Sequence, residues 1–510
     1  MSRRLLSLFV LLPVSVAVLL PVLFMLTATF WENGHLDFST YTVLFQNSTI
    51  QSFGNSLLLA FSVAILSTGA GVILGILLFK TKLPFAFSFT LLLTVPLLIP
   101  PYILALGWYE LLGREGYWGE LLFSFSGTFW VLFCIYLPIP MLLSILFLQQ
   151  INPRFEEAAR LMTGWYGVLR SITLPLLFPA ALLSFLLIFI LTFGEQSVAN
   201  FLRFDVFALE SFTYFSAFYD FRTATVLAVP MILIAGIILF AEQYLAHKHL
   251  FRFNSAHTVE KISLGIYKWP LFLVMFLIIL VIVILPFSSL LIQAADWQSI
   301  QEAFEKAKAP MFRSYLYATA GATLLMGFGF AGGYLIEQKI QGYRLYDALL
   351  IFLFALPAAV IGIALILFWN HPYTNLIYST PLIILFGYTG KYLALTTKIS
   401  QNRLSQIPYS QIEVAQMSGA NWFQIFRYIL LPLSTKTLLT LWLIGLLFSL
   451  RETTITMLVY PPGYETLPVY TLTQMANGDP KIIAGLSLFM IAMILLPLLL
   501  LGMIKKVRHD

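Results

Sequence analysis

Two stretches of the sequence share a spacing of acidic, small and glycine residues that could bind another protein. Each has a glutamate, two small or apolar residues and then a glycine: Glu157, Ala158, Ala159 and Gly164 in residues 149–173 (loop A), and Glu413, Val414, Ala415 and Gly419 in residues 398–429 (loop B). Small side chains let a helix lie close to a groove on a partner, and glycine permits a sharp turn. A basic amphipathic stretch and a Leu-Pro pair follow in each case. The pattern predicts an exposed helix-turn-helix in both loops.

Two further glutamates follow these loops at matching positions. Glu195 and Glu452 lie equally far after Pro175 and Pro432, which begin the next apolar stretches. A helix rises about 1.5 Å per residue, so it would carry both acids to the opposite side of a membrane. Paired carboxylates there could guide a cation along a solute path, and the alternative is a pair of solvated surface acids. Lys391, inside an apolar stretch, is expected to snorkel toward the cytoplasm.

Motifs for catalysis or cofactor binding are absent from the sequence. It has no Gly-rich loop followed by Lys and Ser/Thr, which would bind nucleotide phosphates, and no His/Asp/Glu cluster with the spacing of metal ligands. Cys134 is the single cysteine, which excludes an internal disulfide and a cysteine-rich metal site. No catalytic, cofactor-binding or metal site is therefore predicted in this chain.

The composition requires that membrane-spanning helices position these residues. Of 510 residues, 60% are hydrophobic and only 10% are charged, with a mean hydropathy of +0.89, whereas soluble domains have about 25% charged residues. A span needs about 20 mostly apolar residues. The first apolar stretch exceeds the roughly 7 to 15 residues of a signal peptide and is counted as a span. Twelve spans are predicted, at 5–30, 52–79, 86–112, 128–148, 174–192, 223–244, 270–292, 314–336, 348–369, 378–397, 430–448 and 483–504.

The distribution of basic residues predicts the orientation. Lys and Arg are retained on the cytoplasmic side of membranes. With both termini inside, most of the 29 lysines and arginines fall in cytoplasmic segments, including loops A and B. The net charge of +6 reflects this asymmetry, so a nucleic-acid partner is not predicted.

The two halves of the chain are copies of one unit. Three correspondences relate them: Pro96–Trp108 with 357–369, Ser56 with Ser314, and loop A with loop B. Six spans in each copy leave the halves parallel, related by an axis along the membrane normal. The predicted division is a first helix and outer loop at 1–51, a first transmembrane domain at 52–245, a cytoplasmic linker at 246–268, a seventh helix and outer loop at 269–310, a second transmembrane domain at 311–502 and a cytoplasmic tail at 503–510.

At loops A and B the chain resembles the permeases of type I ATP-binding cassette (ABC) importers. Their signature is Glu-Ala-Ala, three residues, Gly, and a Leu-Pro pair about a dozen residues later. Loop B fits with Val414 in place of one Ala, whereas in loop A Thr163 stands at the glycine position and Gly164 comes one residue late, which leaves the turn there open. The resemblance implies that each loop is a coupling helix on a cytoplasmic ABC ATPase dimer, which binds and hydrolyses the ATP. The alternative is an amphipathic loop at the lipid surface.

The fusion of two such units, with PPYILALGW early and LPAAVIGIAL late, is most similar to the ferric-iron-type permeases and their thiamine and phosphonate relatives. The resemblance implies an all-α polytopic protein of the bacterial inner membrane with the type I ABC permease fold. It would carry a solute that an extracytoplasmic binding protein delivers. Ferric iron is the first candidate for this solute, and thiamine and phosphonate are the alternatives. An ion-coupled secondary transporter usually has several ionisable groups deep in its spans. Here Lys391 is the one clear candidate, so this function ranks second. An intramembrane enzyme ranks third.

Overall fold

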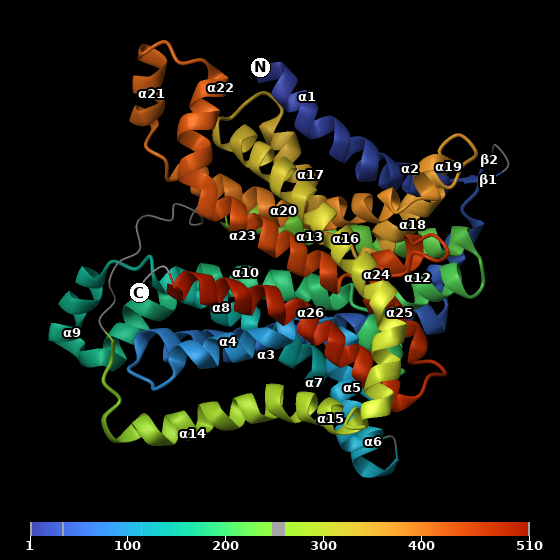
Figure 1. The fold of residues 1–510 in the computed structure, drawn as a ribbon, viewed down its shortest axis with the longest axis horizontal. Helices are drawn as coiled ribbons and strands as arrows, with labels where there is room; N and C mark the ends of the chain where they lie inside the picture. Colours follow the sequence, from blue (N-terminus) through green and yellow to red (C-terminus); the bar gives the residue numbers. More distant parts are fainter. Residues whose placement is uncertain (1–2, 33–34, 114, 247–260, 508–510) are drawn as a thin grey trace.

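The computed structural model describes residues 3–32, 35–113, 115–246 and 261–507, which are mostly helical (Figure 1). Its strands, β1 (Trp31–Glu32) and β2 (His35–Leu36), form a short antiparallel hairpin. Most of the predicted linker and the end of the predicted tail lie outside the described residues. The predicted all-α membrane fold is confirmed.

The helices of the first half extend from the N-terminus to the linker. They are α1 (Arg3–Val14), α2 (Leu20–Ala28), α3 (Asn47–Lys80), α4 (Ala86–Leu98), α5 (Pro101–Leu112), α6 (Gly116–Leu122), α7 (Phe125–Tyr136), α8 (Pro138–Leu148), α9 (Pro153–Val168), α10 (Leu174–Phe193), α11 (Ser197–Phe201), α12 (Phe207–Ser216) and α13 (Phe221–Ala246). Short π-helical turns join several neighbours into continuous runs, including α1 to α2 and α9 to α10.

The helices of the second half repeat this series. They are α14 (Lys268–Ile279), α15 (Leu285–Gln293), α16 (Trp297–Glu337), α17 (Tyr343–Ala355), α18 (Ala358–Trp369), α19 (Asn375–Tyr378), α20 (Leu382–Ser405), α21 (Tyr409–Met417), α22 (Trp422–Ile425), α23 (Leu431–Arg451), α24 (Thr454–Val459), α25 (Leu467–Gln474) and α26 (Pro480–Val507). In each half one long helix packs against two equivalent partners. Helix α3 packs against α8 and α10, and α16 packs against α20 and α23.

Among the described residues, nine helical runs are long and apolar enough to cross a membrane, and two bent helix pairs raise the number to eleven. All twelve predicted spans fall on helices, but the count of twelve is not confirmed. The segment predicted at 378–397 lies in α20, which is outside this set. Its polar residues, including Lys391, lower its hydropathy.

The spans predicted at 86–112 and 348–369 are not continuous helices, and this prediction was wrong. The axes of α4 and α5 differ by 102° (the first break), and those of α17 and α18 by 107° (the second break). Ile99 and Leu356, which precede Pro100 and Pro357, are extended, with ψ of 157° and 138°. Proline has no N–H for the helix ladder and disfavours α conformation in the residue before it. The prolines therefore turn the chain sharply at matching positions.

The breaks also correct the alignment of the two copies. Pro96, predicted to match Pro357, lies inside α4, whereas Pro100 ends its break as Pro357 does. The separation between Pro100 and Pro357 equals that between Pro175 and Pro432. The equal spacing from proline to tryptophan placed this correspondence four residues away from its structural counterpart.

The predicted match of Ser56 with Ser314 is confirmed by an identical contact. The backbone N–H of Phe207 donates to Ser56 Oγ, and that of Leu467 donates to Ser314 Oγ, each at 2.8 Å. The long helices also use glycines in the same way. A Cβ at Gly71 would lie 2.3 Å from Pro140 Cγ, and one at the matching residue Gly329 would lie 2.4 Å from Thr396 Oγ1. Glycine therefore allows the close approach of α3 to α8 and of α16 to α20.

Each half places its first span against the other half. Helix α2 packs against α18, and the adjoining turn is held by Trp369 Nε1, which donates to the carbonyl oxygen of Ala17 at 3.3 Å. Helix α15 packs against α5, where Ser289 Oγ donates to the carbonyl oxygen of Gly107 at 2.6 Å. The helix that follows each break is thus covered by the first span of the opposite copy.

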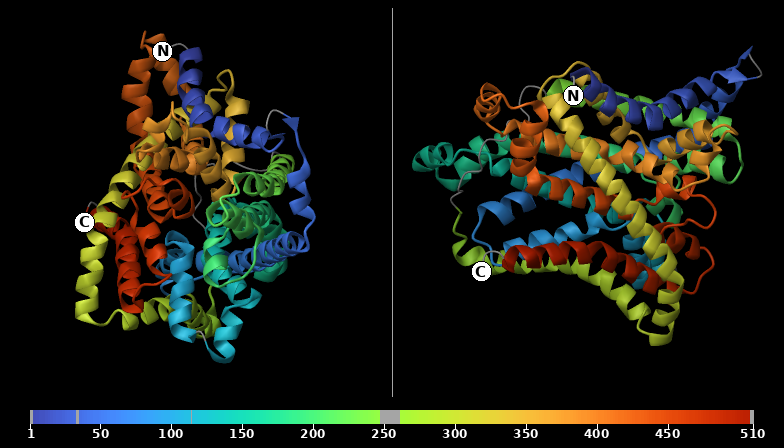
Figure 2. Two further views of the ribbon diagram at one scale, coloured as in Figure 1. Left: turned by 90° about the vertical axis from the view of Figure 1, so that its right-hand side faces the viewer. Right: turned by 45° about the horizontal axis from the view of Figure 1, so that its top comes forward.

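The two ends of the molecule differ in character (Figures 1 and 2). Helices α9 and α21, from loops A and B, project at one end, whereas the hairpin, α12 and α19 lie at the other. Loops A and B therefore lie on the same side of the spans, as the repeat predicts.

Candidate functional site

Both loops form the predicted helix-turn-helix. In loop A the chain turns at Gly164, with φ 66° and ψ −177°, a conformation essentially restricted to glycine. In loop B it turns at Gly419, with φ 82°, between α21 and α22. A Cβ at either position would meet no atom within 4 Å, so backbone conformation, not space, favours glycine. The turn left open for loop A is present, one residue later than in loop B.

The turns present exposed apolar side chains at the end of the molecule. Leu161 and Met162 in loop A are 90% and 88% exposed, and Met417 in loop B is 89% exposed. Glu157, Ala158, Glu413 and Val414 are exposed beside them, and Ala159 and Ala415 are half-buried. Large apolar groups that gather on a polar loop mark an interaction surface. Both loops thus present apolar side chains that either a partner protein or the lipid surface would cover.

Two tryptophans brace the loops from within. Trp422 Nε1 donates to the hydroxyl of Tyr334 at 3.1 Å, which ties loop B to α16. Trp165 lies under the guanidinium of Arg160, 4.8 Å from the ring centre, so it holds the two arms of the loop A turn together. The methionines, not the tryptophans, provide the adaptable exposed surface.

Loop A is fastened to the spans by a buried ion pair that sequence reasoning missed. Glu156, 5% exposed, pairs with Lys80 at the end of α3, 1% exposed, and the Thr173 hydroxyl donates to Glu156 Oε1 at 3.2 Å. The acid was assigned to the exposed neighbour, Glu157. A lysine in the last turn of a span was the available signal, but its partner lies far along the chain.

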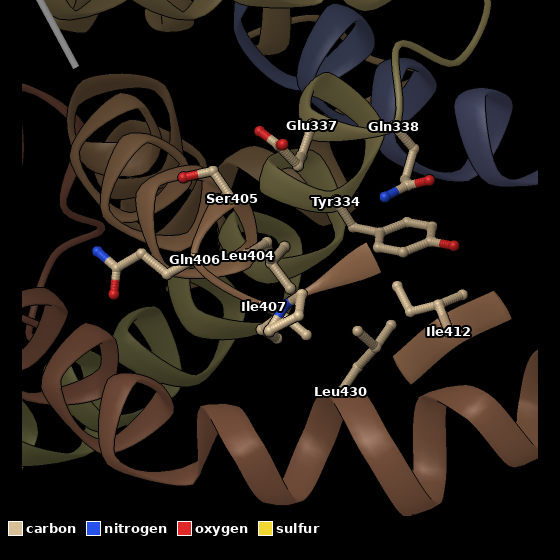
Figure 3. Close-up of a pocket in the computed structure, with 10 residues that line it drawn as sticks. Tyr334, Glu337, Gln338, Leu404, Ser405, Gln406, Ile407, Ile412 and Leu430 are labelled. Carbon is tan, nitrogen blue, oxygen red and sulfur yellow. The ribbon is translucent and has the colours of Figure 1, made fainter. Parts of the chain in front are cut away.

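Loop B is held differently (Figure 3). Gln338 and Ile412 stand where the first copy has Lys80 and Glu156. Ile412 packs in an apolar cluster with Leu404 and Leu430. A cavity of about 270 Å³ lies beside it, lined also by Tyr334 and Gln338. Loop A is therefore anchored by a buried ion pair, and loop B by apolar contacts and the hydrogen bond between Trp422 and Tyr334.

The two glutamates beyond α10 and α23 act as helix caps. Glu195, half-buried, accepts hydrogen bonds from the backbone N–H groups of Ser197 at 2.9 Å and Val198 at 3.1 Å, at the start of α11. Glu452, buried, accepts from the backbone N–H of Ile455 at 2.9 Å, at the start of α24, and from the Tyr392 hydroxyl. Carboxylates at helix N-termini satisfy otherwise unpaired N–H groups. Their matching positions reflect a shared structural role as caps of the short helices that follow α10 and α23.

Lys391 caps the second break, and the prediction that it snorkels toward the cytoplasm was wrong. Its side chain is buried, and Nζ donates to the carbonyl oxygens of Phe354 at 3.0 Å and Leu356 at 2.5 Å. These carbonyls end α17, where the break leaves them without helical partners. A cation at a helix C-terminus also complements the helix dipole.

Arg451 joins the second copy to the first. Its guanidinium donates to the carbonyl oxygen of Leu97 at the first break. Tyr136 is an electrostatic neighbour of both Glu195 and Arg451, and Tyr392 is one of both Glu452 and Arg451.

Glu195 from the first copy and Lys391, Arg451 and Glu452 from the second surround Tyr136, Tyr392 and the two breaks, and these four charged residues are called the break cluster. Its formal charge is zero. The negative potential expected from the carboxylates alone is offset by the two bases.

Comparison with known proteins identifies relatives of both halves. Residues 324–507 match the family model described as "Binding-protein-dependent transport system inner membrane component". The chain is 25% identical over 482 residues to the ferric transport system permease protein of Actinobacillus pleuropneumoniae, covering 86% of this chain and 68% of the relative. It is 24% identical over 444 residues to an Fe(3+)-transport system permease protein of Haemophilus influenzae, covering 84% of each. The spermidine/putrescine transport system permease protein of Escherichia coli is 23% identical over 208 residues, 39% of this chain and 72% of the relative.

Proposed function

We propose that the chain is the permease subunit of an ABC importer and forms the membrane path for ferric iron. Residues 324–507 match the model of the binding-protein-dependent transport system inner membrane components, which supports the importer assignment. The observation that carries the solute assignment is the similarity to ferric permeases through both halves of the chain. The polyamine permease covers only 39% of the chain. The break cluster is formally neutral, so it does not by itself favour a cationic solute.

Loops A and B are the docking sites for a cytoplasmic ABC ATPase dimer, with one subunit under each loop. The exposed side chains of Leu161, Met162 and Met417 support this assignment, as does the position of both loops at one end of the molecule (Figure 1). ATP binds and is hydrolysed on the partner. A solute-binding protein docks at the opposite end, outside the cytoplasm, and both termini lie in the cytoplasm of a bacterial cell.

In this proposal Glu195 and Glu452 shape the solute path as well as lining it. Each fixes the start of the short helix that follows α10 or α23. Repeats related by an axis along the path bring matching positions to opposite sides of the same opening. The two capped helices would therefore face each other across that opening.

A reconstituted transporter tests this function. The chain would be inserted in proteoliposomes with the ATPase and the binding protein encoded beside it, and uptake of radiolabelled ferric iron would be measured with and without ATP. We expect ATP- and binding-protein-dependent uptake that excess thiamine, spermidine or 2-aminoethylphosphonate does not reduce. Transport of one of these instead of iron would overturn the solute assignment. Failure of the ATPase to associate at all would overturn the importer assignment.

A further inference from the structure

The two helix breaks are capped by different means. At the second break, Lys391 and the carbonyls of Phe354 and Leu356 all belong to the second copy. At the first break, the Leu97 carbonyl accepts from Arg451, which belongs to the opposite copy. The first break therefore depends on the other half of the molecule for its cap.

The matching positions of the first copy hold no cations. Gly194 matches Arg451, because Glu195 matches Glu452. Ile135 matches Lys391, because Tyr136 and Tyr392 are the corresponding neighbours of these glutamates. Both cations thus come from the second copy, and the symmetry of the fold is broken at this contact.

The equivalent contact of the first copy with the second break involves no charged group. Gly194 lies against the second break, where a Cβ would be 3.0 Å from Pro357 Cβ. The end of α10 therefore meets the second break through van der Waals contact, and the end of α23 meets the first break through a charged donor. These two matched contacts between halves lie about the repeat axis, where the solute path of a two-repeat permease runs. Non-helical backbone inside a membrane is tolerated where it is buried in protein or lines such a path.

We propose that the contact between Arg451 and the Leu97 carbonyl is a latch that holds the solute path closed, and that the first break is the part that moves. The second break, fixed within its own copy by Lys391, is the stationary wall. Opening separates the Arg451 guanidinium from the carbonyl and frees the first break, while the second keeps its cap. Arg451 is a positioning residue in this account. The inference rests on the proposed permease function.

The latch is strong enough to set the closed population. Hydrogen bonds to charged groups contribute more than neutral ones, and leaving the half-buried Leu97 carbonyl without a donor adds a desolvation penalty to the closed state. Loss of the donor should raise the open population by at least about tenfold, which corresponds to about 1.4 kcal/mol. The path would then open without the binding protein.

The decisive variant is Arg451→Gln in the complete transporter, with its ATPase, in lipid nanodiscs. We expect ATP hydrolysis in the absence of binding protein to rise about tenfold. Amide hydrogen exchange should increase at 95–99 and stay unchanged at 353–357. Arg451→Lys keeps a cation and should give a smaller rise at the same residues.

Two matched variants serve as controls. Lys391→Gln removes the other cap and should increase exchange at 353–357 but not at 95–99. Lys306→Gln removes a half-exposed lysine that pairs with Glu302 on the outside of α16, and it should match the wild type in every measurement.

Wild-type ATP hydrolysis and wild-type exchange at 95–99 in a folded Arg451→Gln complex would overturn the latch. An equal increase at both breaks would also overturn it, because the breaks would then not be independent. If Arg451→Gln does not assemble, hydrogen exchange in Arg451→Lys decides. An increase in exchange confined to 95–99 supports the latch, and the absence of any increase contradicts it. Hydrogen exchange needs no solute. If iron uptake fails but the expected exchange pattern is seen, the assignment of ferric iron is wrong and the latch proposal stands.

Discussion

At the residue scale, the glutamates of this chain act by capping helices and by pairing with a residue far away in the sequence. Glu195 and Glu452 were found from their equal spacing after two prolines, yet their partners are N–H groups of short helices that no hydropathy pattern marks. Glu156 was missed because an exposed acid stands next to it. Its partner, Lys80, is brought to it only by the packing of the spans. Long-range pairs of this kind cannot be deduced from local spacing.

The first prediction concerns this ion pair. Glu156→Ala leaves Lys80 buried without a partner, which should destabilise loop A by about 3 to 5 kcal/mol. Thermal unfolding of the detergent-solubilised protein, followed by size-exclusion chromatography, measures the loss, and ATPase association should fall with it. Glu157→Ala, at the exposed neighbour, should leave the unfolding temperature unchanged. The double variant Lys80→Met with Glu156→Leu should recover much of the stability. Equal unfolding temperatures for Glu156→Ala and Glu157→Ala would contradict the ion pair's role.

At the element scale, the helix-turn-helix loops were predictable and the helix breaks were not. Small residues, a glycine and a Leu-Pro pair fix a local conformation, so loops A and B follow from the sequence. Hydropathy averages over a window and carries no direction, so 86–112 and 348–369 read as single spans. Pro100 and Pro357 were the signal for the breaks. A proline inside an apolar run is often tolerated in membrane helices, so its effect depended on packing.

The second prediction compares the two turn glycines. Gly164 has a backbone conformation that other residues rarely adopt, so Gly164→Ala should cost about 1 to 3 kcal/mol of local stability. Gly419 lies at φ 82°, where asparagine is better tolerated than alanine, so Gly419→Asn should retain more ATPase association than Gly419→Ala. Association is measured by co-purification of the ATPase.

Gly54→Ala is the control for these variants. Gly54 lies within α3 at an ordinary helical φ, and a Cβ there would meet no atom within 4 Å. This substitution should leave ATPase association unchanged. Normal ATPase association for Gly164→Ala would show that the loop A turn is not needed for docking.

At the scale of the whole molecule, the sequence predicted two parallel copies but not how they interlock. The repeat was detectable because matching residues keep nearly constant separations. The exchange of first spans, with α2 on α18 and α15 on α5, leaves no such trace, because each surface is apolar whichever copy covers it. The asymmetry of the break cluster was likewise invisible, since it depends on contacts between halves.

The third prediction concerns orientation in the membrane. In intact cells, a cysteine at Ser405 in loop B should be shielded from a membrane-impermeant thiol reagent. One at Ala217, which is exposed at the opposite end, should react. The native Cys134 is buried and should give no background. Ser211, also in that region, is unsuitable because it is fully buried. Labelling at Ser405 without labelling at Ala217 would reverse the topology.

The central claim is that both loops dock on a cytoplasmic ATPase, and cross-linking in native membranes tests it most directly. Single cysteines would replace Met162 and Met417, the exposed side chains at the two turns. Treatment with a short thiol-to-amine cross-linker should join each variant to the ATPase encoded beside this chain, and the double variant should carry two ATPase subunits. A cysteine at Ala217 should give no such product. If neither loop cross-links to the ATPase while both cysteines remain reactive to small thiol reagents, the loops are not coupling helices and the account is wrong.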